Sequence, residues 1–156
     1  MRMPRPLVGA TAGFLATIPM TAVMTALYPL LPRGQHYSLP PSQITGKATQ
    51  AMGLQLHIDQ NDHRLLTALT HFGFGSMTGT LYTPLARRLP APPAITGMAY
   101  GLLVWLTSYM GWLPALGVLP HAAREPRGRN ALMIVAHLVW GLSLGLLTER
   151  LDADTK

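Results

Sequence analysis

Four long stretches of the chain contain no charged residue, and the charged residues gather in the shorter segments between them. The uncharged stretches cover residues 6–31, 65–85, 91–119 and 130–148. Each is long enough to cross about 30 Å of hydrocarbon as a helix. The pattern predicts an all-α polytopic membrane protein, with four transmembrane helices in a single domain of residues 1–156.

The connection between the first two stretches, residues 32–64, has a weaker pattern of its own. After Pro40 and Pro41, apolar residues recur at helical spacing, at Ile44, Ala48, Ala51 and Met52. Gly53 is a suitable stop. We therefore expect a short helix that lies on the membrane surface. A solvated loop with partial helicity is the alternative.

Comparing the chain with itself predicts a duplication, because small residues and histidines recur in the same order. In the first and third stretches, Gly9 and Gly13 align with Gly97 and Gly101. In the second and fourth, His71, Gly75 and Gly79 align with His137, Gly141 and Gly145. Small residues at a spacing of four mark the face on which helices approach closely. The four helices are thus expected to form two tandem pseudo-repeated helical hairpins that pack through these eight glycines.

His71 and His137 share a helical face with the glycines, so both are expected to point inward at similar depth. An ionisable residue inside a membrane helix is a candidate functional group. Three uses remain open. Each imidazole could hydrogen-bond to a neighbouring helix and fix the packing. The pair could instead bind a cofactor, with haem b the obvious one. Proton or metal-ion handling is the third use.

The composition supports the membrane assignment and argues against a nucleic-acid-binding protein. Only 12% of the residues are charged, and the net charge is +6. The arginines and lysines lie at segment ends, where they can meet anionic lipid head groups, so nucleic acid is not expected as a partner. Lys and Arg are equally frequent on the two predicted sides. Because Arg2 and Arg5 precede the first helix, both termini are assigned to the cytoplasm.

Other candidate chemistry is sparse. His57, Asp59, Asp62 and His63 could form a surface metal site, although their spacing matches no known signature. The nine methionines form no dense cluster, and the chain has no cysteine. No nucleophile with a base, no phosphate-binding loop and no pair of carboxylates is evident. Catalysis is therefore disfavoured.

Three segments carry a resemblance to a known kind of protein: residues 9–24 (GATAGFLATIPMTAVM), 71–82 (HFGFGSMTGTLY) and 137–147 (HLVWGLSLGLL). They resemble small uncharacterised four-helix bacterial inner-membrane proteins of the YagU-like kind. The resemblance implies a bacterial inner membrane. It implies no reaction.

We therefore expect a non-enzymatic integral inner-membrane protein of structural or accessory type, with an intramembrane pair of histidines at the helix interface. A haem- or metal-binding protein that uses His71 and His137 is one alternative, and a small transporter or channel subunit is the other. The lipid bilayer is the expected partner, together with a second copy of the chain or another membrane protein.

Overall fold

The computed structural model describes residues 4–54 and 57–153, and their regular secondary structure is entirely helical, which confirms the all-α class. Arg2 lies outside the described residues. The helices are α1 (Arg5–Leu27), α2 (Pro40–Ala51), α3 (Gln60–Ala86), α4 (Pro93–Thr107), α5 (Leu113–Ala115) and α6 (Arg127–Ala153). A π-helical turn, Ser108–Trp112, joins α4 to α5, and 3₁₀ turns are formed by Tyr28–Leu30, Arg33–Gln35 and Ala122–Arg124.

The prediction of four transmembrane helices is wrong. Among the described residues, only two helical segments are long and apolar enough to cross a membrane, Arg5–Leu30 and Arg127–Ala153. The third predicted helix, residues 91–119, fails on length, because α4 has 15 residues where a crossing needs about 20. Gly111 has non-helical backbone angles, and Pro114 has no N–H to continue the helix.

The second predicted helix fails on polarity, although α3 is 27 residues long. The predicted segment has no charged residue, but it contains many hydroxyl groups, which lower its hydropathy. Some of them are satisfied within the helix, as where Thr78 donates to the carbonyl of Phe74 at 2.7 Å. Other hydroxyl groups donate hydrogen bonds to backbone carbonyls of α1, as where Ser76 donates to the carbonyl of Ala10 at 2.9 Å. The segment is uncharged but not strongly apolar.

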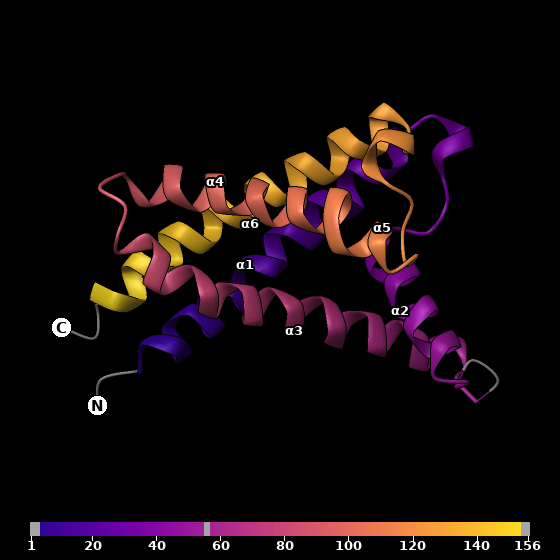
Figure 1. Ribbon diagram of the computed structural model, residues 1–156, viewed down its shortest axis with the longest axis horizontal. Helices are drawn as coiled ribbons and strands as arrows, with labels where there is room; N and C mark the ends of the chain where they lie inside the picture. Colours follow the sequence, from indigo (N-terminus) through magenta and orange to yellow (C-terminus); the bar gives the residue numbers. More distant parts are fainter. Residues whose placement is uncertain (1–3, 55–56, 154–156) are drawn as a thin grey trace.

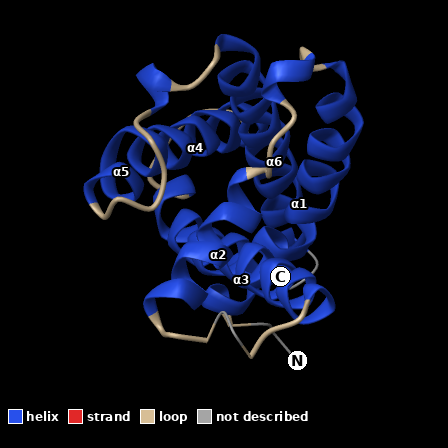
Figure 2. Cartoon of the chain, turned by 90° about the vertical axis from the view of Figure 1, so that its right-hand side faces the viewer, coloured by secondary structure: helices blue, strands red, loops and turns tan. Residues whose placement is uncertain are grey.

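The two apolar helices lie at the centre of the molecule. α1 packs against both α3 and α6, and α6 packs against both α1 and α4 (Figures 1 and 2). Fully buried alanines, Ala12 and Ala16 of α1 and Ala136 of α6, allow a close approach. Neighbouring helices run antiparallel, and the described chain begins and ends at the same end of the molecule (Figure 1).

The outer helices α3 and α4 make few contacts with each other. In the predicted duplication, α1 corresponds to α4 and α3 corresponds to α6. An exact repeat would therefore make the α3–α4 contact equivalent to the close α1–α6 contact. The fold departs from that symmetry, because α3 diverges from α4 toward the end of the molecule where α2 lies (Figure 1).

The connection after α1 contains a helix, α2, that packs on α3. Its buried residues are Pro40, Thr45 and Thr49, and the hydroxyls of Thr45 and Thr70 are 3.1 Å apart. The opposite side of α2 exposes Ala48 and Ala51. Gly53 follows the helix with a positive φ of 69°, a conformation that favours glycine.

Candidate functional site

The eight glycines lie where the helices of each pair approach most closely. A Cβ atom added at Gly97 would collide with the carbonyl oxygen of Gly141, and one at Gly13 with that of Gly75. Additions at the remaining members would also meet backbone of the facing helix or, at Gly75, the side chain of Thr17. The remaining members of the set of eight glycines are Gly9, Gly75, Gly79, Gly101, Gly141 and Gly145. Equivalent glycines thus make similar contacts in α1–α3 and in α4–α6.

A cavity of about 210 Å³ lies where α3 diverges from α4, and we call it the histidine cavity. His71 of α3 and His137 of α6 both line it. The remaining lining residues come from α1, α2, α3, α4, α5, α6 and the π-helical turn: Thr17, Met20, Pro41, Ile44, Thr70, Phe74, Gly75, Thr78, Val104, Ser108, Tyr109, Trp112, Leu113, Met133 and Trp140. The wall is mostly apolar, with a small number of polar groups, which is the usual character of a small-molecule site.

The two histidines have different environments. His137 is 6% exposed, and its Nδ1 lies 2.7 Å from the carbonyl oxygen of Met133. Since a carbonyl only accepts, Nδ1 carries the hydrogen, and Nε2 of the neutral ring is an acceptor. His71 makes no such bond. Its Nε2 is buried and has no hydrogen-bond partner among the described residues.

Tyr109 is a third polar group of the cavity, and no motif in the sequence singles it out. It is 7% exposed, and its ring packs edge-on against His137 with centroids 5.8 Å apart. Its hydroxyl makes no hydrogen bond within the described chain. Tyr109 belongs to the π-helical turn, and such turns are frequent at functional sites. The only sequence signal was the neighbouring Gly111 and Pro114, which interrupt the helix.

The cavity does not fit haem b. Pockets for drug-sized ligands have roughly 300 to 1,000 Å³, and a porphyrin belongs to that size class or above it. At about 210 Å³, the histidine cavity is too small to place a macrocycle between His71 and His137. The two histidines also bring no third ligand with them, since no group of three His, Cys, Asp or Glu side chains comes together in residues 4–54 and 57–153.

That finding also covers the weaker metal candidates in the loop before α3. Asp59 is the N-cap of α3, where its carboxylate accepts hydrogen bonds from the backbone of Asn61 and Asp62 at 2.7 and 2.8 Å. This is the ordinary role of an aspartate at a helix start. His57 and His63 join no metal-ligating group with Asp59 and Asp62 among the described residues.

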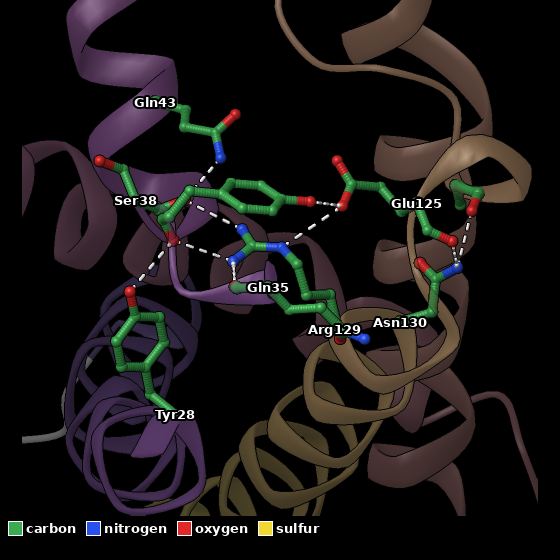
Figure 3. A network of polar contacts seen from close by, with 9 residues as sticks. Tyr28, Gln35, Ser38, Gln43, Glu125, Arg129 and Asn130 are labelled. Carbon is green, nitrogen blue, oxygen red and sulfur yellow. Dashed lines mark hydrogen bonds and ion pairs between the residues drawn. The ribbon is translucent and has the colours of Figure 1, made fainter. Parts of the chain in front are cut away.

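A polar cluster around Arg129 holds the segment that leads into α2 (Figure 3). Arg129 is 4% exposed, and its guanidinium donates to the carbonyl oxygens of Gln35, Tyr37 and Ser38 at 2.9 to 3.1 Å. Its Nε lies 3.3 Å from a carboxylate oxygen of Glu125. The cluster therefore joins the start of α6 to the loop before α2, whereas the sequence had placed this arginine among lipid head groups.

Tyr37 completes the arginine cluster. The guanidinium carbon of Arg129 lies 3.6 Å from the centre of the Tyr37 ring, a cation–π contact. The Tyr37 hydroxyl donates to Glu125. Burial and this hydrogen bond to a carboxylate both raise the pKa of Tyr37 above its ordinary value. The ring, the carboxylate and the guanidinium thus form one connected unit.

Comparison with protein families matches residues 14–146 to a family described as "Protein of unknown function (DUF1440)". The match includes both histidines, Tyr109 and the arginine cluster. Neither the curated proteins nor the solved structures give a match.

Proposed function

The chain belongs to this family of unknown function, and we propose that it is a non-enzymatic integral membrane protein that binds a small molecule in the histidine cavity. The proposal places it in a bacterial inner membrane, with α1 and α6 as the crossing helices and both termini in the cytoplasm. The observation that carries it is the cavity itself, an apolar space with convergent polar groups from three elements.

The outer surface supports the membrane part of the proposal. Large apolar side chains are exposed on the two proposed crossing helices: Phe14, Leu15 and Ile18 of α1, and Val135 and Leu146 of α6. Exposed apolar side chains of this kind are stable against the hydrocarbon of a bilayer, whereas large contiguous apolar patches are rare on soluble proteins. The antiparallel arrangement of α1 and α6 would bring the two ends of the chain to one side of the membrane.

The lining of the cavity supports binding without catalysis. Among the described residues that line it, none carries a carboxylate, an ammonium or a guanidinium group. The polar groups are hydroxyls, two indoles and two imidazoles. Such groups can orient a ligand by hydrogen bonds, but no carboxylate is present to act with an imidazole in acid–base catalysis.

The membrane assignment is tested by fractionation. After alkaline carbonate treatment of bacterial membranes, we expect the protein to remain in the membrane pellet. Release into the soluble fraction would show that α1 and α6 are core helices of a soluble protein. Reporter fusions at Arg5 and Ala153 then test the orientation, and we expect cytoplasmic activity at both positions.

Binding is tested with a panel of small fluorinated ring compounds and ¹⁹F NMR on the full chain in detergent. We expect bound signals that disappear when Thr78→Phe fills the cavity. Thr78 suits this purpose because its hydroxyl bonds only to carbonyls of its own helix. The matched control is Met77→Phe, which adds a ring on the outside, since Met77 is 57% exposed. Signals that survive Thr78→Phe would refute the cavity as the site.

A further inference from the structure

The polar groups of the histidine cavity limit what it can bind. The hydroxyl of Tyr109 can donate, and Nε2 of His137 can accept, while Nε2 of His71 has the role that its tautomer allows. Nε2 of His71 is buried and has no hydrogen-bond partner within the described chain, and the hydroxyl of Tyr109 and Nε2 of His137 make no hydrogen bond there. Leaving a buried polar group such as Nε2 of His71 unpaired is unfavourable. A bound molecule that both accepts and donates would remove that cost.

The apolar remainder of the cavity wall limits the charge that a bound ligand can carry. A carboxylate or an amine in this space would have no oppositely charged side chain among the described lining residues. An ion in an apolar surrounding without a partner is strongly unfavourable. The ligand must therefore be neutral in the bound state.

The volume limits size. A cavity of about 150 Å³ lined by aliphatic and aromatic side chains accommodates benzene. The histidine cavity, at about 210 Å³, has room for one six-membered ring and a small substituent. A hydroxyl substituent supplies both a donor, for His137, and an acceptor, for Tyr109.

We propose that the histidine cavity binds a neutral hydroxylated compound of about one ring, with the hydroxyl between Tyr109 and His137 and the ring against the apolar wall. This inference rests on the proposed function, because it names the ligand class of the same cavity. Water molecules could satisfy the same polar atoms, and an experiment must therefore separate a water-filled cavity from an occupied one.

The test compares 4-fluorophenol with 4-fluorotoluene, which has a similar shape but no hydroxyl group. Binding to the full chain in detergent is followed by ¹⁹F NMR, with partition into protein-free micelles subtracted. We expect 4-fluorophenol to bind at least tenfold more tightly than 4-fluorotoluene. Tyr109→Phe should lower the affinity for 4-fluorophenol about five- to tenfold and leave the affinity for 4-fluorotoluene unchanged. Tyr28→Phe, which removes the hydroxyl of a residue that does not line the cavity, should change neither affinity.

The outcomes distinguish the two proposals. If both compounds bind equally tightly and Thr78→Phe abolishes both, the cavity is a binding site but the hydroxyl class is wrong. If neither compound binds above the micelle background, while the protein is folded by far-UV circular dichroism, the cavity holds water and both proposals fall. If neither Tyr109→Phe nor His137→Leu lowers the affinity for 4-fluorophenol, the proposed ligand class is also wrong.

Discussion

Replacing Gly97 by alanine should force α4 away from α6 and destabilise the protein. The added methyl carbon would lie 3.0 Å from the nitrogen and from Cα of Gly145, and closer still to the carbonyl oxygen of Gly141. All three obstacles are backbone atoms, so no change of rotamer relieves the collision. The helices themselves must move.

The size of the effect follows from ordinary packing distances. Carbon atoms pack at about 3.5–4.0 Å, so the helices must separate by roughly 1 Å. Overpacking of a well-packed interface costs about 1–3 kcal/mol. Alanine has a higher helix propensity than glycine by up to about 1 kcal/mol, which offsets part of the loss. We expect Gly97→Ala to lower the free energy of unfolding by about 1–2 kcal/mol.

The matched control is Gly73→Ala. Gly73 is also inside a helix, but it is exposed, and an added Cβ would meet nothing within 4 Å. Here only helix propensity changes, so the variant should be more stable than the original protein by about 0.5–1 kcal/mol. The same glycine-to-alanine substitution is thus expected to lower the free energy of unfolding at Gly97 and to raise it at Gly73.

Unfolding is measured by titrating sodium dodecyl sulfate into mixed micelles and following tryptophan fluorescence and far-UV circular dichroism. If Gly97→Ala gains stability, as Gly73→Ala is expected to, then α4 and α6 do not approach as closely as the structure shows. A loss at both positions would mean that the substitution acts through something other than the helix interface. Gly9→Ala tests the equivalent contact of α1 with α3 and should lose stability as Gly97→Ala does.

Two further predictions concern the arginine cluster. Arg129→Ala should cost about 3–5 kcal/mol of unfolding free energy, because it leaves a partly buried Glu125 without its ion pair. Arg127→Ala, which removes the same charge from an exposed site, should stay within about 0.5 kcal/mol of the original protein, and equal losses would refute the cluster. Because the pKa of Tyr37 is raised on folding, stability from this group is present below about pH 10 and lost as the pH rises through the folded pKa. Tyr37→Phe should remove that part of the alkaline stability loss, and an unchanged profile between pH 9 and 12 would contradict it.

Much of the helical framework could be predicted from the order of residues along the chain. Uncharged stretches indicated where helices run, and the spacing of four between glycines indicated the face on which they pack. The same face contained His71 and His137. In the structure the glycines lie at close helix contacts and both histidines line the cavity. These inferences are local, because helical periodicity fixes which side chains share a face.

The absence of charged residues does not by itself make a helix apolar enough to cross a membrane. α1 and α6 are apolar enough to cross a membrane, but α3 contains many hydroxyl side chains and α4 ends early at a π-helical turn. The residues responsible, such as Thr78, Gly111 and Pro114, were visible in the sequence. Their combined effect lowers the hydropathy of α3 and shortens α4, so that two segments and not four are apolar and long enough to cross.

The sequence by itself determined the helical class and which glycines and histidines share a helical face, because both follow from periodicity within a single segment. Only the tertiary structure decided that α3 diverges from α4 and leaves the histidine cavity between them. It also decided that Tyr109 lines this cavity and that Arg129 is buried against carbonyls from a distant loop. These features depend on how separate helices are placed relative to one another, and that placement arises from the packing of the whole molecule.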